Sequence, residues 1–181
     1  TGSARGRRLK QLEGLEPRPT TGRVKEAVFS ILQFDIEGRR VLDLFAGTGQ
    51  LGIEALSRGA ASAVFVEKRR DAANLIRENL KLTELTARAR VVGGEAEAFL
   101  AGCRERFDLI FLDPPYAAGL LEGALEMISR FDILANHGIM VCESPAEREL
   151  PDLPAPYSKH RVYHYGKTRI TTYHREEDVE R

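Results

Sequence analysis

The stretch of sequence that decides the fold is Val41-Leu42-Asp43-Leu44-Phe45-Ala46-Gly47-Thr48-Gly49-Gln50-Leu51-Gly52. Its first half is apolar, as in a buried strand, and its second half has the spacing of a helix. Its glycines fit the pattern G-x-G-x-x-G. Glycines let the backbone turn sharply and let a ligand lie against main-chain N–H groups at the positive end of the helix. The stretch therefore predicts a strand, turn and helix that bind a nucleotide-like cofactor.

From residue 40 onward, short apolar runs alternate with longer helical segments, which is typical of β-α-β units with helices on both faces of a parallel sheet. The expected strands cover residues 41–45, 63–67, 89–93, 107–112 and 138–143, and the expected helices cover residues 49–58, 71–85, 95–104 and 119–131. Residues 160–165 and 168–174 are rich in β-formers and flank Gly166-Lys167, which predicts an antiparallel hairpin at the sheet edge. The expected fold is α/β, with a doubly wound, mostly parallel, Rossmann-like sheet.

The chain of 181 residues fits a single domain with an extension at its beginning. Apolar side chains in residues 23–34 are spaced as one helix face, and Thr20 or Thr21 is the candidate N-cap. The expected organisation is a basic arm over residues 1–22, a leading helix over residues 23–34 and a ligand-binding core over residues 40–181.

The composition excludes several classes of protein. Hydrophobic residues make up 43% of the chain, which is enough to bury one core at this length. No apolar run approaches the roughly 18 residues of a membrane span, and no apolar segment follows the basic residues near the start. We therefore expect a cytoplasmic protein without membrane contact. Cys103 and Cys142 lack metal-ligand spacing, so we expect free thiols and no bound metal.

Lys plus Arg and Asp plus Glu both total 27, so the formal net charge is zero. That balance argues against indiscriminate binding to nucleic acid. The charges are unevenly placed, because residues 1–25 carry an excess of five positive charges and residues 91–156 an excess of eight negative charges. A basic beginning is typical of a polyanion-binding arm and equally of a solvated tail, and charge alone does not separate the two.

Two acidic residues near the glycine-rich turn bear on the cofactor. Glu67 ends the second expected strand, which suits a carboxylate that grips two ribose hydroxyls. A carboxylate at Asp43 would repel the pyrophosphate of a dinucleotide but attract the ammonium and sulfonium of S-adenosylmethionine. The sequence therefore favours S-adenosylmethionine, held by Asp43, Ala46, Gly47, Thr48, Gly49, Glu67 and Lys68.

The loop after the third expected strand would border the adenine ring of this cofactor. Glu95 or the amide of Ala96 could meet the edge of the ring there. Glu95 could equally cap the next helix, so both interpretations stay open.

Asp113-Pro114-Pro115-Tyr116 follows the fourth expected strand directly. Two prolines fix a stiff turn at the carboxyl end of the sheet, where ligands of open α/β folds bind. An exocyclic amino group on a base is a poor nucleophile, because its lone pair is delocalised into the ring. Asp113 and a main-chain carbonyl of the turn can each accept one N–H and so direct the lone pair, while Tyr116 can stack on the base. A paired base would first have to be extruded from its stem.

The turn from Asp43 to Gly49, Glu67 and the Asp-Pro-Pro-Tyr loop together resemble class I S-adenosylmethionine-dependent methyltransferases that modify planar amino nitrogens. Further segments are similar to the RsmD-type bacterial 16S ribosomal RNA guanine-N2 methyltransferases. These segments are RGRRL (5–9), RPTTGRVKE (18–26), LGIEALSRG (51–59) and ES (143–144). The similarity spans nearly the whole chain, and residues 18–26 are its most specific part.

The resemblance implies a substrate and a partner. The substrate would be one guanine of the small-subunit ribosomal RNA, guanine-966 in the family, methylated at N2 on an assembling 30S particle. Asp113, on the Pro114-Pro115 turn, would hold the amino group, and Tyr116 would stack on the base. We expect a monomer. The candidates for phosphate contacts are Arg5, Arg7, Arg8, Arg18 and Arg23, although each is equally consistent with a solvated arginine.

Other functions use parts of the same pattern. An adenine-N6 DNA methyltransferase would use the same loop, although a separate target-recognition domain does not fit in 181 residues. A protein glutamine methyltransferase would favour Asn in place of Asp113. A dinucleotide oxidoreductase would need a hydride-transfer constellation that the sequence lacks. A noncatalytic RNA-binding assembly factor would bind the cofactor weakly, so calorimetry with S-adenosylmethionine and with NAD separates these classes.

Overall fold

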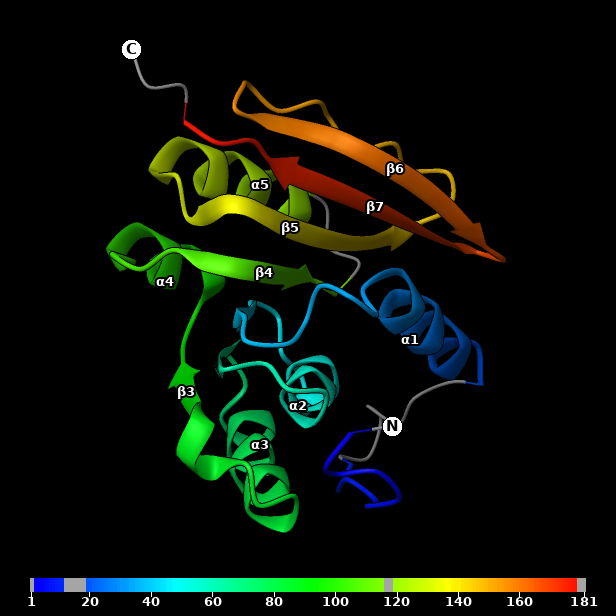
Figure 1. The fold of residues 1–181 in the computed structure, drawn as a ribbon, viewed down its shortest axis with the longest axis vertical. Helices are drawn as coiled ribbons and strands as arrows, with labels where there is room; N and C mark the ends of the chain where they lie inside the picture. Colours follow the sequence, from blue (N-terminus) through cyan, green and yellow to red (C-terminus); the bar gives the residue numbers. More distant parts are fainter. Residues whose placement is uncertain (1, 12–18, 116–118, 179–181) are drawn as a thin grey trace.

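The computed structural model describes residues 2–11, 19–115 and 119–178. Within these residues, seven strands form one sheet in the order β3-β2-β1-β4-β5-β7-β6 (Figure 1). The strands β1 to β5 pair in parallel, whereas β7 is antiparallel to both β5 and β6. The predicted doubly wound sheet with a C-terminal hairpin is confirmed. The strand bounds are β1 Arg40–Asp43, β2 Ser62–Glu67, β3 Ala89–Gly93, β4 Phe107–Leu112, β5 Leu134–Pro145, β6 Tyr157–Tyr165 and β7 Thr168–Arg175.

Helices cover both faces of the sheet. Side chains of α1, α2 and α3 pack in one buried cluster, and side chains of α4 and α5 pack in a second cluster on the opposite face. Neighbouring strand residues alternate between the clusters, as Val41 and Leu42 do. The helices are α1 Pro19–Ile31, α2 Gln50–Ser57, α3 Arg70–Leu82, α4 Ala96–Gly102 and α5 Leu120–Phe131, with a 3₁₀ turn η1 at Thr86–Arg88. No helix in the described ranges is long and apolar enough to cross a bilayer.

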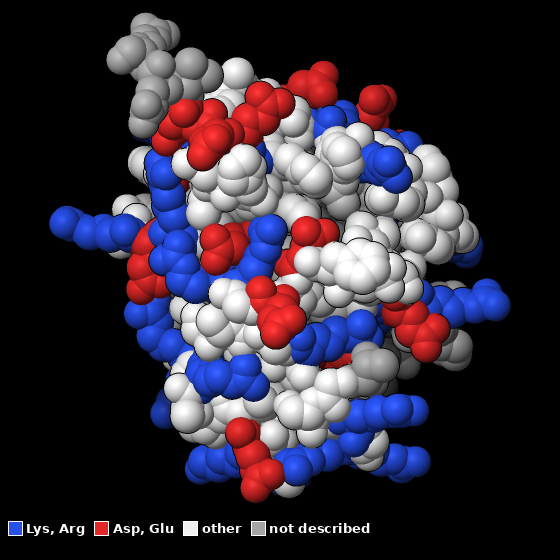
Figure 2. Space-filling model, in the orientation of Figure 1, with Lys and Arg blue, Asp and Glu red and all other residues white. Residues whose placement is uncertain are grey.

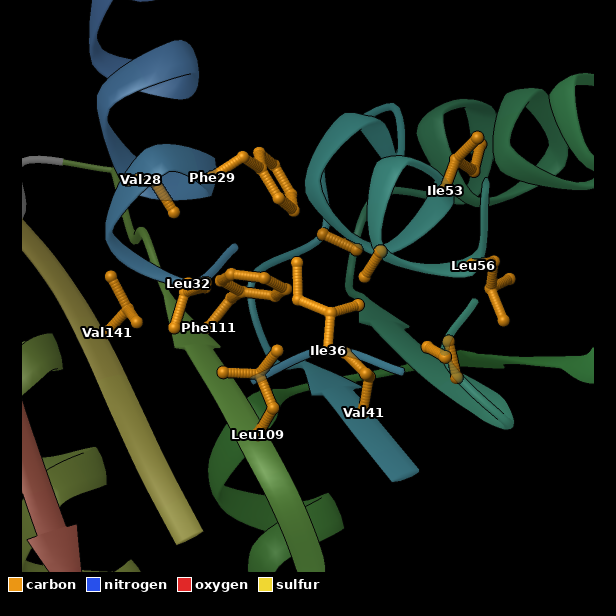
Figure 3. Close-up of a cluster of buried hydrophobic side chains, with 14 of the residues drawn as sticks. Val28, Phe29, Leu32, Ile36, Val41, Ile53, Leu56, Leu109, Phe111 and Val141 are labelled. Atoms are coloured by element: carbon orange, nitrogen blue, oxygen red, sulfur yellow. The ribbon is translucent and has the colours of Figure 1, made fainter. Parts of the chain in front are cut away.

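The first helix is part of the core rather than an appendage. Phe29 of α1 is 1% exposed, and its ring centroid lies 5.8 Å from that of Phe111 on β4. Figure 3 shows Val28, Phe29 and Leu32 pointing from this helix toward the sheet residues Leu109 and Phe111. Such burial stabilises the fold by roughly 1.5–3 kcal/mol for each large side chain. The core therefore fixes α1 beside the carboxyl ends of the strands.

The glycine-rich turn between β1 and α2 needs glycine for two different reasons. Gly47 and Gly49 have φ angles of 58° and 84°, in the left-handed region that favours glycine. Gly52 lies in the first turn of α2, where an added Cβ would come within 2.3 Å of the Phe65 ring on β2. Gly52 therefore lets α2 lie close against the sheet.

Several predicted boundaries were wrong. The helix α1 begins at Pro19 and ends at Ile31, whereas residues 23–34 were expected. Thr20 and Thr21 fall within these helix bounds rather than at the position that precedes the helix. Proline is favoured at the first helical position because its φ angle suits a helix and its missing N–H is not needed there. The strand β5, Leu134–Pro145, extends beyond the expected residues 138–143 at both ends because it pairs with β4 on one side and β7 on the other.

Candidate active site

A cleft of about 2140 Å³ opens at the carboxyl ends of the parallel strands. The loops after β1, β2, β3 and β4 and the end of β5 line it, and α1 and the β6–β7 turn contribute to its rim. The arrowheads of β4 and β5 point toward this region beside α1 in Figure 1. A pocket for one small ligand usually measures about 300–1,000 Å³. The cleft is therefore large enough for two ligands side by side.

Glu67 ends β2 and anchors the glycine-rich loop. Its Oε2 atom accepts a hydrogen bond from the amide of Gly47 at 2.7 Å, and its Oε1 atom accepts one from the amide of Arg69 at 3.1 Å. The side chain is half-buried in the wall of the cleft. Each carboxylate oxygen has a second lone pair. Glu67 can therefore still accept hydrogen bonds from two neighbouring hydroxyl groups of a ligand.

Asp43 lies directly behind the surface of the cleft. It is 1% exposed, and its Oδ2 atom accepts a hydrogen bond from the amide of Gly52 at 3.0 Å. Burial raises the pKa of Asp43 to about 7, the Gly52 hydrogen bond opposes this rise, and the negative charge of Glu67 adds to it. A cation bound nearby would stabilise the ionised form. Asp43 does not line the cleft, so a ligand there would be influenced by its charge rather than by direct contact.

The other predicted cofactor residues gather on one wall. Glu95 occupies the N-cap position of α4 but makes no capping hydrogen bond with its side chain, so the alternative role as a cap is not realised. Gly49 lies behind the wall as the N-cap residue of α2. The predicted cofactor residues that line the cleft are Ala46, Gly47, Thr48, Glu67, Lys68, Glu95 and Ala96.

Asp113, Pro114 and Pro115 form the part of the wall that follows β4. Tyr116 lies outside the described residues. Burial raises the pKa of Asp113 well above its usual range, and the negative charges of Glu143 and Asp43 raise it further. The proline corner thus brings a carboxyl group that favours its neutral form to the same cleft as the glycine-rich loop.

Glu143 is a residue of this wall that the sequence reasoning did not assign to the site. It lies near the end of β5, is half-buried and lines the cleft. Its carboxyl group lies beside that of Asp113, so its negative charge raises the pKa of Asp113, and burial raises the pKa of Glu143 itself. The parallel pairing of β4 with β5 brings Glu143 beside Asp113. The family-like segment ES (143–144) contains Glu143, but it does not indicate which residue lies next to it.

The arginines expected to contact phosphate have different environments. Arg5, Arg8 and Arg23 are exposed, and Arg23 lies on the rim of the cleft. Arg7 donates to the carbonyl oxygen of Leu82 at 2.7 Å and to Oε2 of Glu84 at 2.8 Å, so it ties the N-terminal segment to the end of α3. Arg18 lies outside the described residues.

The rim also carries basic residues that the sequence reasoning did not single out. Lys25 of α1 lines the large cleft and, with Arg7 and Arg8, a smaller one of about 570 Å³. His164 and Lys167, beside the β6–β7 turn, line the large cleft from another side. On the face drawn in Figure 2, basic and acidic side chains are interspersed, and the basic ones are most frequent toward the lower end.

Asn79 connects the N-terminal segment to the glycine-rich loop. It is fully buried in α3, and its Oδ1 atom accepts a hydrogen bond from the amide of Lys10 at 2.6 Å. Its Nδ2 atom donates to the carbonyl oxygens of Lys10 at 3.0 Å and Thr48 at 3.3 Å. One side chain thus contacts both the basic arm and the wall of the cleft.

Comparisons with known proteins identify relatives over nearly the whole chain. A family model described as "Conserved hypothetical protein 95" matches residues 1–174. YlbH of Bacillus subtilis, named provisionally as an rRNA methyltransferase, is 41% identical over 176 residues, which are 96% of each chain. Ribosomal RNA small subunit methyltransferase D of Escherichia coli K12 is 39% identical over 175 residues, 97% of this chain and 88% of its own length. The structure of Escherichia coli yhhF, described provisionally as a methyltransferase, has a TM-score of 0.88 and 36% identity, with 98% of this chain and 97% of that chain covered.

Proposed function

This chain belongs to the family that contains ribosomal RNA small subunit methyltransferase D, and we propose that it methylates the N2 amino group of a guanine in small-subunit ribosomal RNA. One observation carries the proposal. The glycine-rich loop with Glu67 and the Asp113-Pro114 corner face the same cleft, which has room for a cofactor and a base. The fold is that of class I methyltransferases, and S-adenosylmethionine is the methyl donor.

The residues of the cleft fit this cofactor. Glu67 has lone pairs for the two ribose hydroxyls, and the N-terminus of α2 behind Gly49 suits the methionine carboxylate. Glu95 and the amide of Ala96 border the position of the adenine ring. The charge of Asp43 favours the ammonium and sulfonium groups and would disfavour a pyrophosphate. When bound, the cofactor supplies an electrophilic methyl group on its sulfonium.

The protein's own contribution to the reaction is to position the amino group. The lone pair of an exocyclic amino nitrogen is delocalised into the base, so the nitrogen must be held with its lone pair directed at the methyl carbon. The neutral Asp113 accepts one amino N–H on its carbonyl oxygen, and a main-chain carbonyl of the proline corner accepts the other. The proline ring at 114, which is buried, keeps this corner stiff. We assign stacking on the base to Tyr116.

The proposed target is guanine-966 of the family, presented on an assembling 30S particle and flipped out of its stem. Arg5, Arg8, Arg18 and Arg23 would contact RNA phosphates, which fix the register of the RNA on the protein. Arg7 would act mainly by holding the arm to the end of α3, because its guanidinium group is already paired. We further propose that the arm and core together form one monomeric catalytic domain.

The test uses the purified protein with S-adenosylmethionine labelled in its methyl group. Its substrates are 30S particles from cells that lack the enzyme, naked 16S ribosomal RNA, duplex DNA and total protein. The proposal expects label in one 16S guanine, recovered after nuclease digestion as N2-methylguanine and mapped by mass spectrometry. Label in DNA adenine or in protein, or no transfer to either form of the RNA, would overturn it.

A further inference from the structure

Strand register places Glu143 next to Asp113. The strands β4 and β5 are parallel, and Leu112 pairs with Cys142. The residues that directly follow this pair along the chain are Asp113 and Glu143, and both line the cleft. Their carboxyl groups therefore lie beside each other, and a proton between them would join them by a hydrogen bond. Two adjacent oxygen-bearing groups, rather than one, face the position of the target base.

A hydrogen bond between two carboxyl groups requires one proton between them. The pKa of Asp113 is raised well above its usual range by burial and by the neighbouring charges of Glu143 and Asp43, so Asp113 holds the proton and donates it to Glu143. The pair then carries one negative charge, located on Glu143. The remaining lone pairs of both residues are hydrogen-bond acceptors.

The pattern of acceptors matches one purine and not the other. Guanine presents its N1–H and its N2 amino group side by side on one edge, so it offers neighbouring donors. Adenine presents its N6 amino group beside N1, which is an acceptor. Adenine would require a second proton on the pair, carried by Glu143, before Glu143 could donate a hydrogen bond to N1. A buried acceptor left facing another acceptor costs about as much as a lost hydrogen bond.

Building on the proposed function, we infer that Glu143 selects guanine by accepting a hydrogen bond from N1–H while Asp113 holds the N2 amino group. Glu143 is then a specificity-determining residue that contacts the substrate. The negatively charged acceptor strengthens this contact, because hydrogen bonds to ionised groups are stronger than those between neutral groups.

The test compares two RNA substrates that differ in one base. Two 16S ribosomal RNAs are prepared with a synthetic segment that contains the target position. One carries guanine at that position and the other 2-aminopurine, and both are assembled into 30S particles. 2-Aminopurine keeps the amino group at C2 but has an unprotonated N1. The kcat/KM ratio of guanine to 2-aminopurine is measured for wild type, Glu143→Gln and the control Glu147→Gln. Glu147 is an exposed acid that lines the same cleft, so its variant makes the same charge change.

The ratio should fall roughly 10- to 100-fold in Glu143→Gln, because Gln offers N1 a donor as readily as an acceptor. Glu147→Gln should keep the wild-type ratio. A Glu143→Gln variant that loses activity on both substrates in equal proportion would overturn the inference, since that is the result of a purely structural role. If that variant transfers no methyl group at all, Glu143→Asp decides, because it keeps a charged acceptor and should retain the preference for guanine. A lost preference in Glu143→Asp would overturn the inference.

Failure of the proposed function gives a different result. In that case the wild-type protein itself transfers no methyl group to the guanine substrate, although it binds S-adenosylmethionine. A wild-type protein that methylates guanine, with a ratio unchanged by Glu143→Gln, rejects the role of Glu143 alone.

Discussion

The Oε2 atom of Glu67 lies 2.7 Å from the amide nitrogen of Gly47 and accepts its hydrogen bond. This bond joins the end of β2 to the loop that follows β1, so the residue expected to bind the ribose also shapes the loop expected to bind the rest of the cofactor. The carbonyl oxygen of Glu67 in turn accepts a hydrogen bond from the amide of Gly94, at the start of the loop expected to border the adenine ring. Three loops of the cleft are thus connected through one residue.

Replacing Glu67 by Ala should weaken binding of S-adenosylmethionine by roughly 10- to 100-fold, because the ligand loses a charged acceptor for its ribose and the loop loses its anchor. Isothermal titration calorimetry measures the change. Glu126→Ala is the matched control, because Glu126 is an exposed acid on α5. Equal affinities of wild type and Glu67→Ala would remove Glu67 from the cofactor site.

Replacing Asp113 by Ala should abolish methyl transfer while the affinity for S-adenosylmethionine stays within about tenfold, or roughly 1.4 kcal/mol. Asp113→Asn should retain more activity than Asp113→Ala. The protonated Asp113 of the wild type has a carbonyl oxygen for the amino group and a hydrogen-bond donor for Glu143. The carboxamide of the Asp113→Asn variant offers the same two groups. Single-turnover rates with 30S particles distinguish the variants. The account fails at this point if Asp113→Ala transfers methyl groups at the wild-type rate.

The stability of the protein should fall as the pH rises from about 4 to about 7. The pKa of Asp43 rises from 3.8 to about 7 on folding, so within this interval the folded state binds a proton that the unfolded state has lost. The free energy of unfolding then decreases by roughly 1 kcal/mol per pH unit. Asp113 and Glu143 contribute in the same direction, because their pKa values are also raised.

Asp43→Asn removes the contribution of Asp43 and keeps an oxygen for the Gly52 amide. Urea unfolding at pH 5 and pH 8 should therefore show a smaller loss of stability in Asp43→Asn than in wild type. The same variant should bind S-adenosylmethionine more weakly, since the negative charge near the sulfonium is gone. Parallel pH profiles for the two proteins would contradict the burial of an ionisable Asp43.

Replacing Asn79 by Ala should loosen the N-terminal segment and lower stability by about 1–3 kcal/mol, because the buried side chain makes hydrogen bonds to Lys10 and Thr48. Trypsin should cleave the variant faster at Arg5, Arg7 and Arg8 than it cleaves wild type. The control is Asn74→Ala, since Asn74 is exposed on the same helix and its side chain accepts a hydrogen bond only from Arg77 among the described residues. Identical cleavage rates in the two variants would show that Asn79 does not hold the arm.

Local patterns in the sequence predicted most of the fold. The alternation of apolar runs and helical segments predicted the order of strands and helices along the chain. Apolar residues recur at a different spacing in a strand than in a helix, so the two kinds of element can be told apart. The glycine-rich turn and Glu67 followed from spacing within a single β-α-β unit. Helix α1 began earlier than predicted because Pro19 starts a helix as readily as a threonine cap does.

Contacts between distant elements could not be predicted in the same way. Glu143 reaches Asp113 only because Leu112 pairs with Cys142, and the apolar pattern of either strand does not set that register. In the sequence alone, nothing distinguishes Asn79 from other polar residues of an amphipathic helix. Its role follows from its hydrogen bonds to Lys10 in the N-terminal segment, which the sequence does not predict. Lys25 and Lys167 come to the rim of the cleft from opposite ends of the chain.

A crystal structure of the protein with S-adenosylhomocysteine tests the central claim most directly. The account predicts the ribose hydroxyls on the carboxylate of Glu67, the adenine beside Glu95 and Ala96, and the sulfur directed toward Asp113 with space for a purine between them. A ligand bound elsewhere, or a ribose turned away from Glu67 with the sulfur on the far side from Asp113, would contradict it.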